Sequence, residues 1–132
     1  MNDLIFHHIG IACESIEESI ADYEQLGYFV VGKQFEDPNQ GIRGVFMENA
    51  GVQIELLEPL DEKSPLHSFL NRGVQMYHQG FFCDDILDTS LDMVEKGAMI
   101  VSPAKPAVAF NGRSVCFLMM PNKMLIELIG TE

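Results

Sequence analysis

The sequence predicts an α+β fold made of two paired strand–helix–three-strand modules, and two observations support it. The stretch His8-Ile-Gly-Ile-Ala-Cys13 is answered seventy residues later by His78-Gln-Gly-Phe-Phe-Cys83, with His, Gly and Cys in the same places. Near the end of each half, Ile54-Glu-Leu-Leu57 is answered by Ile126-Glu-Leu-Ile129. In a chain this short, a repeat of this kind indicates two copies of one supersecondary unit that share a core.

The first half carries one strand, one helix and three further strands. We expect a strand over Leu4–Cys13, in which alternation places His8 and Gly10 on the same face. Ser15 is a good N-cap, with a Glu three residues on as its capping-box partner, and Gly27 ends the helix that follows. Three strands are expected over residues 29–31, 42–48 and 52–57, with a turn-rich loop over 35–41.

The second half repeats this order, with a strand over 76–83, a helix over 85–96, and strands over 99–101, 114–120 and 123–129. Between the halves, Ser64 and Pro65 predict the start of a linker helix. The one departure is Ser102–Gly112, a Pro- and Ala-rich stretch that we read as a loop, either a lid or a mobile surface connection. We therefore expect a single domain over residues 1–132, with module one at about 4–60, the linker helix at about 61–73 and module two at about 74–130.

Composition narrows the function classes. The chain has 132 residues, and twenty Asp and Glu against eight Lys and Arg give a net charge of −12. Such acidity argues against nucleic acid and anionic membranes as partners. No apolar run approaches the roughly 18–20 residues that cross a bilayer, and no signal peptide is visible. Three Cys without a short paired spacing do not make a disulfide framework, so we expect a reduced, cytoplasmic protein.

Four residues of the repeat form a candidate metal site. Glu55 and Glu127 stand between apolar residues in segments that otherwise read as buried strands, and burying a lone carboxylate costs several kcal/mol. Each half also supplies an inward His at its start, His8 and His78. Two imidazoles and two carboxylates are a normal ligand set for one divalent ion, Zn, Ni, Co, Mn or Fe. The alternative is that the Glu side chains face solvent and the His are ordinary core residues.

Other polar residues have weaker signals. Arg43 and Arg113 are related by the repeat and are candidates for binding a substrate carboxylate or phosphate, with a salt bridge to a surface acid as the alternative. Cys13 and Cys83 match in position and read as small core residues more than as a redox pair. His7 points away from His8 and is expected at the surface or in a dimer contact.

Three segments, "HHIGIA" at residues 7–12, "IELLEPL" at 54–60 and "LIEL" at 125–128, resemble the vicinal oxygen chelate superfamily. That superfamily includes glyoxalase I, methylmalonyl-CoA epimerase, extradiol dioxygenases and bleomycin-resistance proteins. The resemblance covers nearly the whole chain and implies that the paired modules curl into a cupped, mostly antiparallel sheet around a metal. Carried over, the ligands fall on His8, Glu55, His78 and Glu127, the residues that the repeat had selected.

Within the superfamily, two features favour different enzymes. "DPNQGIRGVF" and "IELLEPLDEKSPLHSFL" are similar to methylmalonyl-CoA epimerases, some of which carry a catalytic Glu where this chain has Gly44. Glu48 lies four residues further on and would have to reach the site differently. The His-Glu-His-Glu set resembles that of glyoxalase I, although the chain is short for that enzyme.

We therefore expect a glyoxalase I-like (lactoylglutathione lyase) activity that moves a proton α to a carbonyl through a metal-stabilised enediolate. One of the carboxylates Glu55 and Glu127 would act as the base. The alternatives are epimerisation of an acyl-CoA, dioxygenase chemistry, and non-catalytic binding of a small molecule. The expected partners are a thioester or hemithioacetal substrate and a second copy of the chain in a homodimer, with neither nucleic acid nor membrane.

Overall fold

The computed structural model describes residues 4–131, which divide into two compact units. Residues 8–77 form one, here called the N-terminal unit, and residues 4–7 together with 78–131 form the C-terminal unit. Each unit has its own hydrophobic core. Among the described residues, none of the helices combines the length and the apolar character needed to cross a bilayer.

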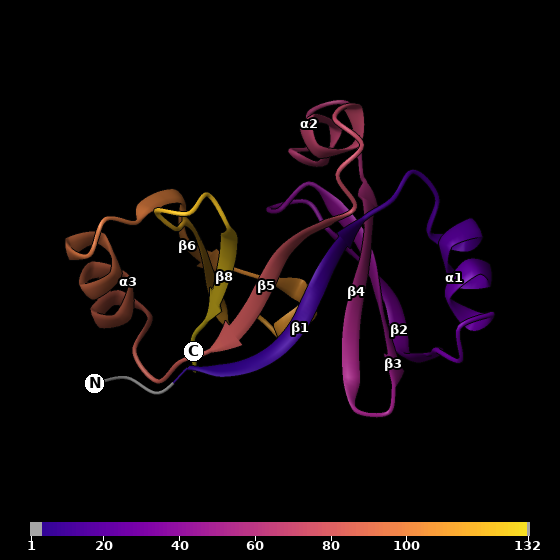
Figure 1. Ribbon diagram of the computed structural model, residues 1–132, viewed down its shortest axis with the longest axis horizontal. Coiled ribbons are helices and arrows are strands. Elements are labelled where there is room, and N and C mark those ends of the chain that lie inside the picture. The colour runs from indigo at the N-terminus through magenta and orange to yellow at the C-terminus, as the bar shows by residue number, and fades with distance from the viewer. Residues whose placement is uncertain (1–3, 132) are drawn as a thin grey trace. The chain divides into compact units, whose positions relative to one another are not determined.

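The order of elements is the predicted one (Figure 1). The chain runs through β1 (Ile5–Ala12), α1 (Ile16–Glu24), β2 (Phe29–Asp37), β3 (Ile42–Asn49), β4 (Val52–Pro59), α2 (Leu66–Asn71), β5 (Met76–Phe82), α3 (Ile86–Glu95), β6 (Met99–Pro106), the 3-10 helix η1 (Val108–Phe110), β7 (Ser114–Met119) and β8 (Leu125–Ile129). The α+β class and the repeated strand–helix–three-strand order are confirmed. The extent of a single domain stays a prediction.

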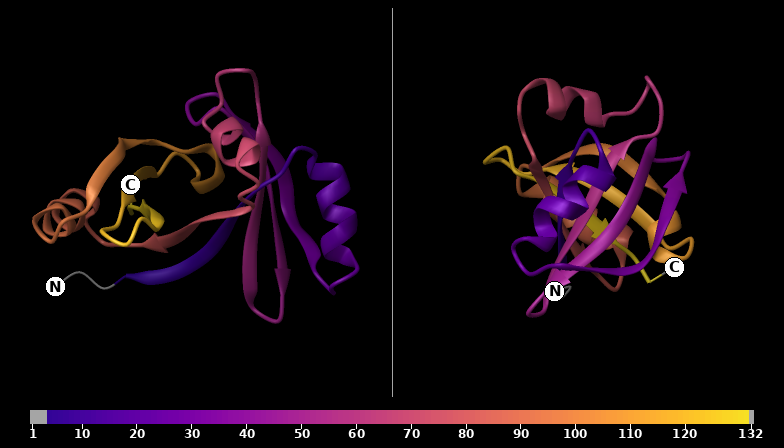
Figure 2. Two further views of the ribbon diagram at one scale, coloured as in Figure 1. Left: turned by 45° about the horizontal axis from the view of Figure 1, so that its top comes forward. Right: turned by 90° about the vertical axis from the view of Figure 1, so that its right-hand side faces the viewer.

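In the N-terminal unit the strands lie in the order β2-β3-β4-β1, with β1 parallel to β4 and the other pairs antiparallel. Alternate side chains point to opposite faces of these strands. One face packs under α1, which Figure 2 shows alongside the strands. The buried residues of this core are Ile11, Cys13, Ile16, Val45, Met47, Ile54 and Leu56. The other face carries Glu55 and is called the inner face below.

The C-terminal unit repeats this plan. Its strands lie in the order β5-β8-β7-β6, with β5 parallel to β8 and the other pairs antiparallel. The core under α3 is formed by the buried residues Cys83, Ala98, Cys116, Leu118, Ile126 and Leu128. The opposite face, which carries Glu127, is the inner face of this unit.

Side-chain caps start helices α1 and α3. The Ser15 hydroxyl, the predicted cap of α1, accepts a hydrogen bond from the N–H of Glu18 at 3.2 Å. Asp85, expected as the first residue of its helix, is instead the N-cap of α3, and its carboxylate accepts from the N–H of Asp88 at 3.0 Å. The predicted cap of the linker helix is one residue out, because α2 has Pro65 as its N-cap, although the Ser64 hydroxyl accepts from the N–H of Leu66 at 3.3 Å. Each bond satisfies a backbone donor that a helix start leaves open, so the local sequence fixes where the helices begin.

Two predicted loops are wrong in part, because β2 continues to Asp37 and β6 to Pro106. Both strands pass through register irregularities, one between Val31 and Phe35 and the others after Ile100. The predicted strand over 29–31 stopped at the bulge of β2, and the turn residues of the predicted loop lie in the turn at residues 38–41. The Pro residues of the second predicted loop lie on or next to β6, an edge strand where Pro is tolerated because one side needs no ladder bond. The two alternatives for this segment, a lid or a surface connection, stay predictions for the shorter connection around η1.

Candidate metal centre

The N-terminal unit brings His8 and Glu55 together on its inner face. In the parallel pairing of β1 with β4, Gly10 lies opposite Glu55, and His8 shares the face of Gly10 two residues earlier. His8 Nε2 lies 3.2 Å from Glu55 Oε1, and the two residues are 0% and 4% exposed. The ring of Phe46 stands edge-on to His8, with centroids 5.8 Å apart. A buried imidazole and a buried carboxylate therefore satisfy each other beside an aromatic wall.

The C-terminal unit builds a second pair in the same way. Gly80 lies opposite Glu127 in the parallel pairing of β5 with β8, and His78 shares its face. His78 Nε2 lies 3.3 Å from Glu127 Oε1, and both side chains are buried. Phe117 stands edge-on to His78 at 5.3 Å. Each module thus delivers one His, one Glu and one Phe in one arrangement.

The chemistry of the donors fits a divalent metal. Imidazole nitrogen and carboxylate oxygen are ligands for Zn, Ni, Co, Mn and Fe, and a cation offsets the cost of burying a carboxylate. Two protein ligands are fewer than the three or four that such ions take. A single pair therefore offers too few ligands for such an ion.

A wall of apolar side chains continues along the inner face of the N-terminal unit. Gly44 pairs with Leu57 and so shares the face of Glu55. A Cβ added at Gly44 would meet the Phe35 ring at 2.5 Å and Leu57 at 2.9 Å. The Phe35 ring therefore fills the space beside Gly44, where some epimerases carry a carboxylate. Glu48 shares this face too, at the far end of β3, half-buried.

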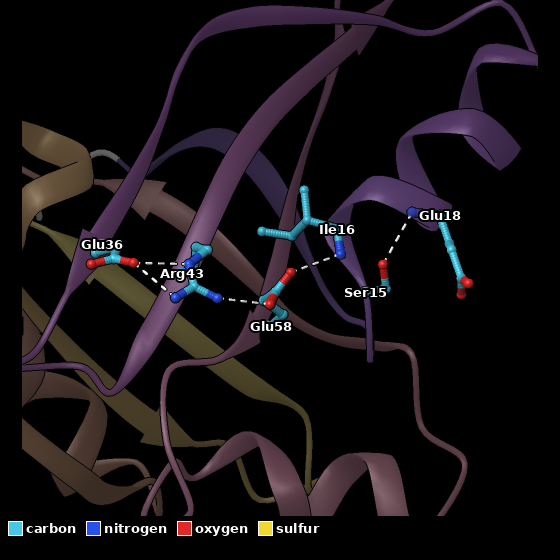
Figure 3. A network of polar contacts seen from close by, with 6 residues as sticks. All are labelled: Ser15, Ile16, Glu18, Glu36, Arg43 and Glu58. Carbon is cyan, nitrogen blue, oxygen red and sulfur yellow. Dashed lines mark hydrogen bonds and ion pairs between the residues drawn. The ribbon is translucent and has the colours of Figure 1, made fainter.

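Arg43 lies on the opposite, helix-covered face. Its guanidinium donates to Glu36 Oε2 at 2.8 Å and to Glu58 Oε2 at 2.9 Å, and Glu58 Oε1 accepts from the N–H of Ile16 at 2.9 Å (Figure 3). The hydrogen bonds to Glu36 and then to Glu58 raise the pKa of Arg43. These contacts are the predicted salt-bridge alternative, and the substrate-binding role of Arg43 stays a prediction that they do not support.

Arg113 has different surroundings. Its Nε donates to the carbonyl of Gly130 at 2.6 Å, and its guanidinium lies 4.7 Å from the centroid of the Phe82 ring. Phe82 follows His78 and Gly80 at alternate positions of β5, so this arginine lies on the inner-face side of its unit. Its substrate-binding role also stays a prediction.

The register explains why the two arginines differ. Phe46 lies opposite Glu55 and Phe117 lies opposite Glu127, so β3 and β7 correspond at an offset of seventy-one residues. The sequence echo of seventy that relates Arg43 to Arg113 is therefore one residue out of register. A slip of one residue moves a side chain to the other face of a strand. Phe46 and Phe117 also correspond at an offset of seventy-one, so a comparison of the sequence at an offset of seventy does not align them. For this reason the two rings were not predicted as part of the site.

The remaining candidates are accounted for by packing. Cys13 and Cys83 are buried and not in disulfides, and burial is the main cause that raises the pKa of each thiol. His7 is half-buried between the rings of Phe82 and Phe110, with centroids 4.6 and 5.5 Å away. The cysteines thus behave as core residues, as expected. His7 packs inside the C-terminal unit and is not fully exposed.

Comparison with known proteins identifies the family. The family described as "Glyoxalase/Bleomycin resistance protein/Dioxygenase superfamily" matches residues 7–117. The chain belongs to this superfamily. The resemblance predicted from the three sequence segments is therefore confirmed.

Individual superfamily members show which branch the chain is similar to. An ethylmalonyl-CoA/methylmalonyl-CoA epimerase of Cereibacter sphaeroides is 30% identical over 126 residues, which cover 92% of this chain and 94% of the relative. The solved structure of methylmalonyl-CoA epimerase from Mycobacterium tuberculosis is 27% identical, with a TM-score of 0.79, covering 96% of this chain and 87% of that one. A hypothetical protein from Bacillus halodurans is 31% identical, with a TM-score of 0.81 and coverage of 99% and 95%.

These relatives overturn one expectation. The prediction of a glyoxalase I-like lyase is wrong, because the relatives named above whose names state an activity are methylmalonyl-CoA epimerases, which are isomerases. The ligand types misled the prediction, since two His and two Glu suit any reaction that moves a proton next to a carbonyl. The four candidate ligands do not distinguish between these reactions, whereas similarity over the whole length also includes the residues around the ligands.

Proposed function

We propose that this chain is a metal-dependent epimerase of a 2-substituted acyl-CoA, of the methylmalonyl-CoA type. The observation that carries the proposal is the 30% identity over nearly the whole chain with an ethylmalonyl-CoA/methylmalonyl-CoA epimerase. The two buried His–Glu pairs support it, because the reaction needs carboxylates that take and return a proton.

The proposed ligand set is His8, Glu55, His78 and Glu127. Each of the four offers one ligand atom and each is buried. Their joining into a single centre is part of the proposal, and it rests on the matched construction of the two pairs and on the incompleteness of each pair alone. Bound there, a divalent ion would stabilise the negative charge that develops on the thioester oxygen when the α-proton leaves.

The carboxylates of Glu55 and Glu127 carry the proton chemistry in this proposal. Epimerisation removes the α-proton from one face of the substrate and adds a proton to the other face, so two acid–base groups are needed. Glu127 and Glu55 come from different modules, and each is a buried carboxylate of an inner face that lies beside a His. One carboxylate takes the proton while the other, protonated, returns one to the opposite face.

The absence of a carboxylate at Gly44 fits this assignment. The Phe35 ring occupies the space beside Gly44, so β3 supplies an apolar wall. Glu55 lies on the neighbouring strand and on the same face. The second acid–base group is therefore assigned to β4 in this chain, and Phe35 and Phe46 keep water from that side of the substrate.

Arg113 is the proposed contact for an anionic group of the substrate. Its guanidinium lies within cation–π distance of the Phe82 ring, on the inner-face side of the unit. An Arg held by a backbone carbonyl and a ring is well placed to receive a carboxylate. A homodimer and a cytoplasmic location remain predictions from the sequence.

The test is an assay on separate (2R)- and (2S)-methylmalonyl-CoA in D₂O, with ethylmalonyl-CoA as the second substrate. We expect interconversion of the epimers with uptake of deuterium at the α-carbon. Chelation should stop the reaction, and adding back a divalent ion should restore it. A purified protein that holds a metal but neither epimerises nor exchanges the α-proton of either thioester would refute the proposal.

A further inference from the structure

Helix α3 carries an apolar stripe that nothing in its own unit covers. Leu87, Leu91 and Val94 are 66%, 54% and 40% exposed. Their spacing of four and then three residues places them on one side of the helix. The core side of α3 is a separate set, in which Ile86 and Met93 pack on the C-terminal core.

The matching helix of the other module lacks this stripe. Seventy residues earlier, α1 has Glu17, Ala21 and Glu24 at the corresponding positions, all exposed. Both helices do the same structural work, since each covers one face of a four-stranded sheet. The fold therefore does not require an apolar outer face, and the stripe on α3 needs another explanation. Apolar side chains that lie side by side on an exposed face are a common feature of interaction sites.

A row of carboxylates runs beside the stripe. Asp88, Asp92 and Glu95 follow at helical spacing on the solvent side of α3, and all three are exposed. Lys96, which follows the last residue of α3, pairs with Asp92 at 3.0 Å. A partner that covers the stripe therefore meets an acidic border.

This border decides which partner fits. A second copy related by a two-fold axis would present the same face, so it would bring an identical row of carboxylates to the contact, whichever way the two helices run. Like charges set opposite each other oppose association. A partner with a basic border meets the row with opposite charge instead.

We propose that α3 is a docking site for an amphipathic helix of another protein, with an apolar stripe and a row of Lys or Arg beside it. The apolar stripes pack together and the basic row lies against Asp88, Asp92 and Glu95, as in helix-in-groove recognition. A ten-residue helix is about 15 Å long, so the contact belongs to the small, transient class of interfaces. The inference does not depend on the proposed enzymatic function.

The experiment uses a synthetic helical peptide with Leu at four- and three-residue spacing and a flanking row of Lys. A second peptide has Glu in place of each Lys. The full-length variant Leu87→Glu/Leu91→Ala/Val94→Glu carries the outer face of α1 on α3, and Leu26→Glu removes an equally exposed Leu elsewhere. We expect binding, measured by fluorescence anisotropy, to fall about tenfold or more in the triple variant and to be unchanged in Leu26→Glu.

Two further measurements keep the outcome decisive. Amide shifts of the wild-type protein should move at α3 when the Lys peptide is added, whether or not the triple variant folds. Light scattering should give the wild type and the triple variant the same mass. Equal binding to both proteins, equal binding of both peptides, shifts away from α3, or a wild-type dimer that the triple variant turns into a monomer would each overturn the proposal, the last in favour of a second copy.

Discussion

The N-terminal and C-terminal units build the same buried pair but differ in what surrounds it. In both, a His from the first strand meets a Glu from the last strand at 3.2–3.3 Å, beside the edge of a Phe. The surroundings differ at the matching positions Gly44 and Val115, one covered by a Phe ring and the other filled by its own side chain.

The difference shows what each part of the module is for. A buried His and Glu need one another, so neither copy can lose its pair without an uncompensated polar group in the core. The side chains around Gly44 and Val115, and the outer faces of α1 and α3, contain no buried polar pair that must be kept. The two copies differ at these places. The repeated pair is therefore the element that the two copies share, and it is the element to which we assign the metal and the proton chemistry.

The largest expected effect separates the two carboxylates. Glu55→Gln and Glu127→Gln should each lower epimerisation about 10²–10⁴-fold, because each removes one of two acid–base groups. Each variant should still exchange the α-proton of one epimer with solvent, and the two variants should choose opposite epimers. Chiral analysis and deuterium uptake measure this, with metal content checked and Glu95→Gln as an exposed control.

Exchange of the same epimer by both variants would place both carboxylates on one face of the substrate. That result would contradict the proposal that each module supplies the acid–base group for one face of the substrate. Full activity in either variant, with metal retained, would remove that Glu from the acid–base pair altogether.

The next effect tests whether the two pairs hold one ion or two. We expect one metal equivalent per chain, and we expect His8→Ala and His78→Ala each to weaken its binding on the order of 100-fold, since one ion loses a quarter of its ligands in either case. Elemental analysis and competition with a chelator measure this, and His67→Ala is the matched control. Two equivalents in the wild type, with one left tightly bound in each variant, would mean two independent sites.

The sequence was sufficient for the fold because its signals are local and repeated. The caps Ser15 and Asp85 fix the helix starts, and the strand alternation that set His8 beside Gly10 survives in the pairing with Glu55. The repeat then supplied both pairs without any knowledge of the fold. Periodicity and capping depend on residues that are close in the sequence, so they can be recognised without the structure.

The errors came from features that neighbouring residues do not determine. The strands β2 and β6 were predicted too short because each passes through a bulge, where the regular alternation of side chains is interrupted. The one-residue slip between β3 and β7 is set by cross-strand pairing, so the echo of Arg43 in Arg113 did not reveal that the two side chains take opposite faces. The apolar filling of position 44 needed the Phe35 ring, nine residues away.

A smaller effect compares the packing around Gly44 with the packing around Val115. Gly44→Ala should destabilise the fold by about 1–3 kcal/mol by overpacking against Phe35, whereas Val115→Ala should destabilise it by roughly 1.5 kcal/mol by leaving a gap. Chemical denaturation measures both. Adding Phe35→Leu should relieve much of the first loss and none of the second. If the double variant Phe35→Leu/Gly44→Ala shows only the sum of the single losses, Phe35 does not fill that space.

The smallest effect concerns Cys13 and Cys83, where the two units should agree. Burial is the main cause that raises the pKa of each thiol above the ordinary value of 9.0, against hydrogen bonds from Ser19 and Thr89 that lower it. The folded state therefore holds the thiol protons more tightly than the unfolded state, so this contribution to stability is present below pH 9 and is lost as the pH rises above it. Thiol labelling at neutral pH should be slower than for a free peptide thiol, and the free energy of unfolding should fall slightly above pH 9 in the wild type and less in Cys13→Ala/Cys83→Ala. Rapid labelling of one cysteine alone would show that the two copies differ in their cores as well as in their walls, and would remove the packing role assigned to that residue.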